Sequence, residues 1–299
     1  VQYLVKEQDG KGYVIKLYVF VDGEISNQIT LAPSEKGKYP ATAFASKMSD
    51  GNYIISGTYS AKDTKDVEAS VGIFLQRVVG GKTISSTYIN YLDLKNFTSG
   101  MSERQLKKIE KKKAKKAENN EEYTIDYNML PYRVMEENGK YLLVGEAYIP
   151  TYAVQQVSTV SSNGSTNMVS QVVFDGWQYT RYFIIEFDQQ GQVLWNTSAP
   201  LEVNKSWTVR RHLALNKVDN TLEIFYPSFG HMNHVTYTYG SDELKTEEIP
   251  FIDAKLKSYS GLNTFLWYDN TFLSTANLKF KDDNGKHKIY CINRITCGK

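Results

Sequence analysis

The chain has 299 residues, 41% of them hydrophobic and 23% charged, so it can bury a full hydrophobic core and is not disordered overall. Its formal net charge of +2 gives no general electrostatic attraction for nucleic acid, and we expect no nucleic-acid partner. No apolar run approaches the roughly 18 residues of a membrane helix, so we expect no transmembrane segment. The 22 tyrosines, the 13 phenylalanines and the β-branched residues of the apolar runs favour strands over helices.

A short phrase recurs along the chain, in which a tight Asp/Asn turn joins two strands; it lies at 50–60, 138–148, 219–229 and 269–280. Self-similarity at intervals of a few tens of residues indicates a repeat architecture. Reading outward from each turn gives units of up to four antiparallel strands. The units and one helical insertion lie at roughly 1–40, 41–100, 101–131 (the insertion), 132–205, 206–255 and 256–299.

In chain order, the first unit is incomplete, with predicted strands at 2–7, 12–21 and 24–31. The second has four, at 43–48, 52–60, 71–79 and 82–92. The segment 102–118 is the one convincing helix, because Ser102 and Gln105 have the pattern of a capping box and strong helix formers follow them. This helix is strongly basic. Since no base-stacking aromatic residues accompany it, we interpret it as a solvated insertion rather than as a binding site for phosphates or an acidic partner.

The third unit is the clearest, with strands at 132–137, 140–148, 180–188 and 192–197. Residues 152–174 alternate on both sides of the turn at 161–165, which predicts a protruding β-hairpin between its second and third strands. The fourth unit has strands at 210–218, 221–227, 234–240 and 245–251, and the fifth at 260–268, 271–280 and 287–296.

These elements predict an all-β fold, a β-propeller of about five four-stranded antiparallel blades in a single repeat domain over 1–299. Radial packing of blades protects sheet edges that would otherwise invite aggregation. A pair of sandwiches or an open β-solenoid is the alternative, because alternating strands and hairpin turns do not distinguish these architectures.

The long connections define the candidate functional surface. Short Asp, Asn and Gly turns join strands one to two and three to four, so the remaining connections emerge together at the opposite end of a propeller. Long insertions fall there, at 61–69, 95–131, 149–179 and the loop through 204–207. Loops raised on a rigid scaffold usually carry binding and catalysis, although insertions also accumulate where they do no harm.

Aromatic residues and one arginine gather where the predicted hairpin meets its unit. The candidate binding residues are Tyr148, Tyr152, Trp177, Tyr179, Arg181 and Tyr182. Rigid rings with an arginine suit a sugar, peptide or protein surface, because they lose little entropy on contact. The alternative is that these side chains pack between the hairpin and its blade and have a structural role. For Trp207 and Trp267 we expect packing in the core.

Motifs for other chemistry are missing, so we expect no cofactor and assign no catalytic residue. Nucleotide-binding glycine loops, a G-x-S-x-G elbow and an H-E-x-x-H pattern do not occur. His231 and His234 have ligand-like spacing but no acidic or cysteine partner adjacent in sequence, so they are only weak metal candidates. The remaining titratable residues of interest are two histidines expected in strands and two cysteines expected to be free thiols: His212, His287, Cys291 and Cys297.

The segments NGKYLLVGEAYIPTY (138–152) and FDGWQYTRYFIIEFDQQGQVLWN (174–196) resemble a family of uncharacterised bacterial proteins with propeller-like repeats. The resemblance covers 120–299 and implies a secreted, periplasmic or cell-envelope location with no established activity. FDQQGQVLW also resembles the D-x-x-G-x-x-x-W phrase of quinoprotein-like propellers, which implies a structural role for Trp195 and no cofactor.

Two functional hypotheses follow. The first is a non-enzymatic binding or scaffold protein that uses the long-loop face for a glycan, peptide or envelope partner. The second is a glycan-active hydrolase of the five-bladed propeller type, which needs paired carboxylates across one glycosidic bond. Its candidate carboxylates are those near the long loops, namely Asp63, Asp66, Glu146, Asp175 and Asp253.

Overall fold

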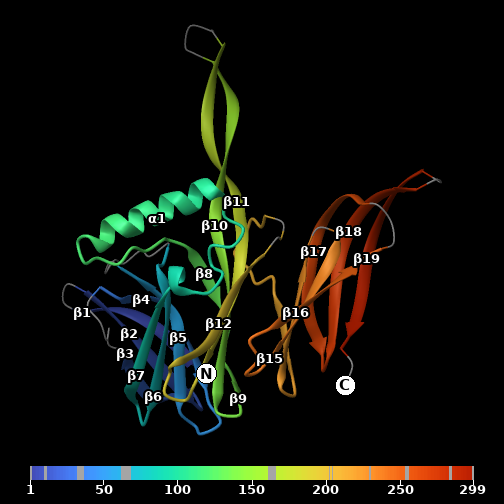
Figure 1. Ribbon diagram of the computed structural model, residues 1–299. Helices are drawn as coiled ribbons and strands as arrows, with labels where there is room; N and C mark the ends of the chain where they lie inside the picture. The colour runs from blue at the N-terminus through green and yellow to red at the C-terminus, as the bar shows by residue number, and fades with distance from the viewer. Residues whose placement is uncertain are drawn as a thin grey trace. The chain divides into compact units, whose positions relative to one another are not determined.

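The computed structural model describes residues 2–9, 12–31, 37–61, 69–160, 166–201, 203, 205–228, 230–252, 256–282 and 285–297. The chain divides into two compact units. Unit 1 comprises Val1–Ala147 and Arg181–Pro200, and unit 2 comprises Tyr148–Thr180 and Leu201–Lys299. The described strands form antiparallel sheets of three to five strands, which confirms the all-β prediction (Figure 1). The assignment of 1–299 to a single domain stays a prediction.

Unit 1 contains the two N-terminal sheets. The first has the order β1-β2-β3, with β1 (Gln2–Asp9), β2 (Gly12–Val21) and β3 (Glu24–Leu31). The second has the order β4-β5-β6-β7, with β4 (Tyr39–Lys47), β5 (Tyr53–Ser60), β6 (Gly72–Val79) and β7 (Lys82–Asn90). The central strands β5 and β6 are buried along almost their whole length, so they are covered on both faces.

A 3-10 turn, η1 (Tyr91–Asp93), and the helix α1 (Glu103–Ala117) follow β7. The predicted helix is confirmed: Ser102 caps it, and the reciprocal bonds of the capping box with Gln105 are both present. None of its residues is buried, so α1 is exposed to solvent. Its cap and its Lys107–Glu103 ion pair each stabilise it only slightly. Among the described residues, no helix is long and apolar enough to span a membrane.

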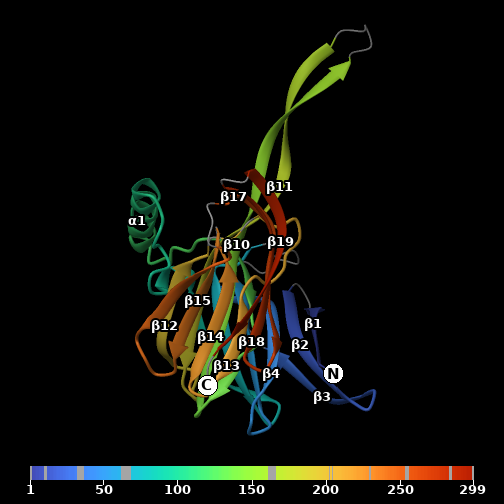
Figure 2. The same cartoon turned by 90° about the vertical axis from the view of Figure 1, so that its right-hand side faces the viewer.

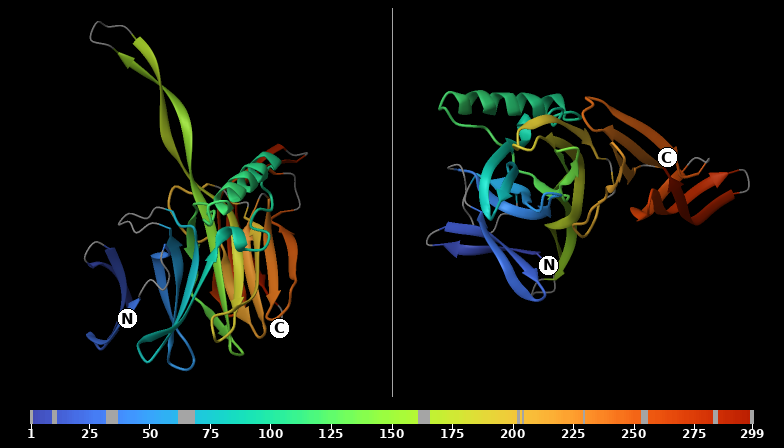
Figure 3. Two further views of the ribbon diagram at one scale, coloured as in Figure 1. Left: turned by 60° about the vertical axis from the view of Figure 1, so that its left-hand side comes forward. Right: turned by 90° about the horizontal axis from the view of Figure 1, so that it is seen from below.

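The middle sheet has the order β12-β11-β10-β8, and β9 also pairs with β10. Its strands are β8 (Asn128–Pro131), β9 (Met135–Glu137), β10 (Lys140–Val160), β11 (Thr166–Phe187) and β12 (Val193–Pro200). The strand β12 pairs with β11 over Arg181–Phe187, and beyond that stretch β10 and β11 continue as a twisted ribbon (Figure 3). The ribbon confirms the predicted hairpin; its turn at 161–165 lies outside the described residues.

The C-terminal strands of unit 2 form two more sheets (Figure 2). One has the order β13-β14-β15-β16, with β13 (Ala214–Val218), β14 (Thr221–Pro227), β15 (His231–Thr238) and β16 (Leu244–Pro250). The other has the order β17-β18-β19, with β17 (Leu256–Tyr268), β18 (Thr271–Asp282) and β19 (Gly285–Thr296). The two sheets share a core in which the rings of Phe225 and Phe272 lie 4.3 Å apart.

The short turns have the predicted backbone. Asn138 and Gly139, between β9 and β10, both have positive φ angles, of 48° and 74°. That combination is the type I′ hairpin turn, whose twist matches the flanking strands. Asp22 and Gly23 repeat it with φ angles of 51° and 87°. The strands next to these turns therefore pair in the register that the turns predict.

Three local predictions need correction or completion. Trp207 and Trp267 do not pack in the core: they are 70% and 55% exposed, because Trp207 lies in a loop and Trp267 lies near the end of an edge strand. His212 precedes β13 rather than lying in it, whereas His287 lies in β19 as predicted. Cys291 and Cys297 are free thiols, as expected.

Candidate functional site

Six rings of unit 2 pack together where the β10–β11 ribbon begins. Tyr148 contacts Trp177 and Tyr179, with ring centroids 5.4 Å and 5.3 Å apart. Phe174 extends the group, since its ring lies 6.2 Å from Tyr152, 5.2 Å from Trp177 and 6.1 Å from Trp207. We call this group the aromatic cluster, and its members are Tyr148, Tyr152, Phe174, Trp177, Tyr179 and Trp207.

The cluster has a buried base and an exposed edge. Tyr179 is buried, and its hydroxyl donates to the Arg210 carbonyl and accepts from the Arg210 amide. Tyr152 is 63% exposed and Trp207 is 70% exposed, although both touch Phe174. Such rings are anchored on one side and available on the other, which is the arrangement of an interface anchor rather than a core residue.

A backbone bridge brings Trp207 to the cluster. The amide of Trp177 donates to the Ser206 carbonyl at 2.7 Å, and the amide of Ser206 donates back to the Trp177 carbonyl at 3.0 Å. An ion pair between Lys205 and Asp175 reinforces the same junction. Trp207 is therefore held beside β11 by main-chain bonds, and the sequence contains no local signal for this pairing.

The structure brings together four of the six predicted binding residues. Tyr148, Tyr152, Trp177 and Tyr179 belong to the aromatic cluster, and Tyr148 and Trp177 are half-buried. Arg181 and Tyr182 belong to unit 1 and are only 4% and 2% exposed. The binding role of these residues stays a prediction, but the two in unit 1 have buried side chains.

The ribbon beyond the cluster lacks charge. Residues 149–174 contain no Asp, Glu, Lys or Arg, in a chain that is 23% charged. Apolar side chains stand out along it, with Val154, Met168 and Val172 each more than 60% exposed. Exposed apolar side chains on an uncharged ribbon are typical of an interaction site, because solvated strands normally carry charge.

A cationic pocket of about 440 Å³ lies in the same unit. It is lined by Lys205, Arg210 and His212 and by apolar or small residues, namely Val203, Pro227, Tyr259, Ser260, Gly261 and Leu262. The His212 ring lies 4.3 Å from the Tyr179 ring, so the pocket adjoins the aromatic cluster. Burial, reinforced by the positive charge of Arg210, lowers the pKa of His212 to about 4.

This depressed pKa predicts a pH-dependent stability. Between about pH 4 and 6.5 the unfolded chain protonates this histidine and the folded chain does not, so the free energy of unfolding should fall as the pH falls. The shift from 6.5 to about 4 corresponds to at most about 3 kcal/mol. Urea denaturation of wild type and His212→Gln at pH 7.5, 6.5, 5.5 and 4.5 measures it. The difference between the two proteins should shrink steadily on acidification; a constant difference would contradict the prediction.

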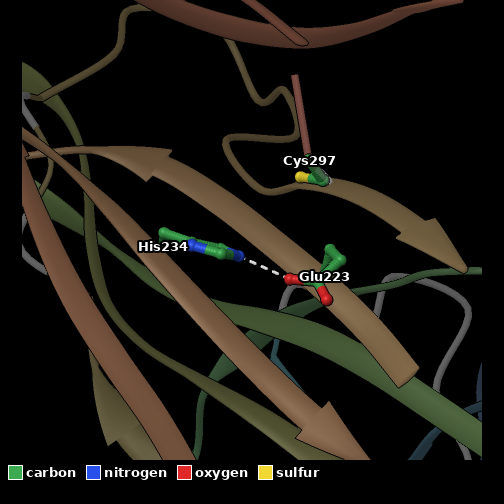
Figure 4. Close-up of side chains that lie close together, drawn as sticks. All are labelled: Glu223, His234 and Cys297. Carbon is green, nitrogen blue, oxygen red and sulfur yellow. Dashed lines mark hydrogen bonds and ion pairs between the residues drawn. The ribbon is translucent and has the colours of Figure 1, made fainter. Parts of the chain in front are cut away.

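Glu223, His234 and Cys297 converge in unit 2, from β14, from β15 and from the end of β19 (Figure 4). Their ligand atoms all lie within 4.8 Å of one another. His234 Nε2 is hydrogen-bonded to Glu223 Oε2. His231 lies outside this group, with its Nε2 3.6 Å from the Glu248 carboxylate. Of the two weak metal candidates, His234 alone has two further potential ligands among the residues that the structure describes.

The thiol of Cys297 is not activated as a nucleophile. Burial raises the pKa of Cys297 to about 11, and the negative charge of Glu223 acts in the same direction. Reactive cysteines need the opposite shift, produced by a nearby positive charge or a helix N-terminus. The group therefore does not have the properties of a cysteine-based catalytic triad.

Of the candidate carboxylates of the hydrolase hypothesis, two lie among the described residues, one in each unit. Glu146 is fully buried in unit 1 and accepts a hydrogen bond from the Tyr132 hydroxyl. Asp175 pairs with Lys205. Asp63, Asp66 and Asp253 lie outside the described residues. Neither the cationic pocket nor a second pocket of about 380 Å³ is lined by an acidic residue.

Comparisons with known proteins give no family. No family model matches the chain, and no curated protein matches it. A protein from Lactobacillus plantarum of known crystal structure aligns with 99% of this chain and 82% of its own, at 10% identity and a TM-score of 0.27. A protein from Bacteroides ovatus, provisionally described as a hydrolase, aligns with 97% of this chain and 93% of its own, at 11% identity and a TM-score of 0.21. Neither likeness supports an activity.

Proposed function

We propose that this chain is a non-enzymatic binding protein that holds an extended segment of a protein partner on the β10–β11 ribbon and the aromatic cluster. The observation that carries the proposal is the uncharged stretch 149–174, which projects apolar side chains into solvent. A two-stranded ribbon offers main-chain groups at its edges, to which an extended peptide can add as a further strand. The side chains of the ribbon then supply specificity for the peptide.

The aromatic cluster supplies the anchor for such a segment. Trp207 and Tyr152 present rings that are already held in place by Phe174, so little side-chain entropy is lost on binding. The pocket beside the cluster suits an acidic side chain of the partner through Arg210, since Lys205 is already paired with Asp175. An extended peptide with an apolar run and an acidic residue is the ligand that these features fit best.

Selection from a phage-displayed random peptide library tests this function. Peptides enriched on the wild-type protein should carry apolar runs with an acidic residue, and Trp207→Ala should weaken their binding at least tenfold, since buried tryptophan anchors contribute about 2 kcal/mol. Trp267→Ala is the matched control, because Trp267 is an exposed tryptophan of β17 outside the cluster. Equal losses in both variants, or selective binding to a glycan array without any enriched peptide, would reject the proposal.

We also propose that the five antiparallel sheets are blades of a propeller and that the protein functions outside the cytoplasm. The succession of three- to five-stranded sheets in chain order supports the first point, and the resemblance of 138–152 and 174–196 to bacterial envelope proteins supports the second. A crystal structure in which the sheets share no central axis would exclude the propeller. Recovery of the native protein only in the cytoplasmic fraction would exclude the location.

A further inference from the structure

We propose that Glu223, His234 and Cys297 form a binding site for a zinc ion, with a water molecule in the fourth position. The three side chains offer one oxygen, one nitrogen and one sulfur atom within 4.8 Å of one another. Bond lengths of about 2.0–2.3 Å in a tetrahedral zinc site place ligand atoms roughly 3.3–3.6 Å apart. Side-chain shifts of about 1 Å would therefore bring this group to zinc geometry.

Neighbouring groups already orient the histidine. Its ring stacks on Phe225, with centroids 4.3 Å apart and an interplanar angle of 5°. Its Nδ1 atom faces the Glu247 carboxylate at 3.7 Å, which leaves Nε2 directed at Glu223. A carboxylate behind a histidine is the usual second layer of a zinc site, because it fixes the ring and strengthens the ligand nitrogen.

The other two ligands are also held in place. The Thr236 hydroxyl donates to Glu223 Oε2 at 2.9 Å. The Cys297 amide donates to the Asn270 carbonyl at 3.0 Å, which fixes the end of β19 against the turn between β17 and β18. The three ligands thus come from two sheets of one unit and are positioned by local bonds.

The geometry favours a metal over a catalytic relay. In a triad, one histidine nitrogen faces the acid and the other faces the nucleophile. Here Nε2 itself bonds to Glu223, and Nδ1 points at Glu247 rather than at the cysteine. A bound cation needs donor atoms from several side chains near one point, and this group provides three. Sulfur with imidazole selects zinc over calcium or magnesium, which prefer oxygen ligands.

Titration of the purified protein with Co²⁺, followed by displacement with Zn²⁺, tests the site. Wild type should bind one equivalent and show a sulfur-to-cobalt charge-transfer band with the visible bands of tetrahedral cobalt; Zn²⁺ should remove both and raise the melting temperature. Cys297→Ala should abolish the charge-transfer band and weaken binding at least about 100-fold, more than the loss of an outer-layer group does. His234→Asn should lose the visible tetrahedral bands.

Cys291→Ala is the matched control, because Cys291 lies in β19, is also a free thiol and hydrogen-bonds to Asn293 instead. It should bind both metals as wild type does. Circular dichroism of the metal-free variants separates loss of a ligand from loss of the fold, and Glu223→Gln provides a third readout if Cys297→Ala does not fold. Absence of stoichiometric uptake by wild type, or unchanged spectra in Cys297→Ala and His234→Asn, would overturn the zinc site.

Discussion

Replacing Gly57 by alanine should destabilise unit 1 by at least about 4 kcal/mol, enough to abolish soluble expression of the full chain. Gly57 lies in the middle of β5, and a Cβ atom there would sit 1.9 Å from the Thr42 carbonyl oxygen and 2.8 Å from the Ala43 Cα. These are backbone atoms of β4, which cannot move aside as a side chain could. Added methylenes in a packed core commonly cost about 1–3 kcal/mol, and a clash with backbone exceeds that range.

The close approach lies next to an irregularity in the sheet. The register between β4 and β5 shifts between Pro40 and Thr42, and Thr42 is the residue whose carbonyl approaches Gly57. Glycine within a strand commonly marks such a bulge.

Ser56→Ala is the control for this substitution, because it changes the adjacent, fully buried residue of β5 without adding volume. The Ser56 hydroxyl has no hydrogen-bond partner in the described part of the chain, so its removal should change stability by no more than about 1 kcal/mol. The yield of soluble protein compares the variants first, and urea denaturation followed by circular dichroism compares those that are soluble. A Gly57→Ala protein that unfolds within about 1 kcal/mol of wild type would show that β4 can relax away from β5.

The sequence repeat itself places a glycine at this position of the strand. When DGNYIISGTYS and NGKYLLVGEAY are aligned on their turns, Gly57 and Gly145 occupy the same place. At Gly145 a Cβ atom would lie 2.2 Å from the Phe183 ring, so both repeats exclude a side chain there. The sequence predicts the strands, the turns and the shared glycine, because these depend on local backbone chemistry. It does not say what approaches each glycine, since that depends on strands far away in the chain.

The aromatic cluster was predictable only where its members are neighbours in the ribbon. Tyr148, Tyr152 and Trp177 lie on strands whose pairing follows from the alternation and the turn between them. Trp207 joins them through the bridge between Trp177 and Ser206, which crosses 29 residues of chain and an irregular loop. No periodic pattern encodes such a contact, so the most exposed ring of the cluster was assigned to the core.

Of the proposed zinc ligands, the two in one hairpin could be placed together from the sequence, and the third could not. Glu223 and His234 lie on one face of a hairpin in which Glu223 pairs with Thr236 and Phe225 pairs with His234. Correct placement of the β14–β15 turn would have revealed this neighbourhood, but the sequence predicted β15 three residues too late, at 234–240 rather than His231–Thr238. Cys297 comes from another sheet, so only tertiary structure brings it to the pair.

Arg181→Ala should cost about 4 kcal/mol of stability, although the sequence pattern had suggested this arginine as a binding residue. Arg181 is only 4% exposed, and its guanidinium donates to the Ser99 carbonyl at 3.1 Å and to the Asn96 carbonyl at 3.4 Å. It also lies 4.6 Å from the centre of the Phe97 ring. Burial lowers the pKa of Arg181, which shows that its charge is kept at a cost that these contacts must offset.

The loss combines a cavity, a lost cation–π contact and two carbonyls without their donor, each worth about 1 kcal/mol or more. Arg181→Lys should recover less than half of it, because an ammonium group cannot bond both carbonyls while it covers the ring. Arg133→Ala, at an exposed arginine of the same unit, should change stability by less than about 0.5 kcal/mol. Urea denaturation of the three variants decides the role of Arg181. If Arg181→Ala retains wild-type stability and instead loses the selected peptides, this arginine contacts the partner and does not anchor the loop around Phe97.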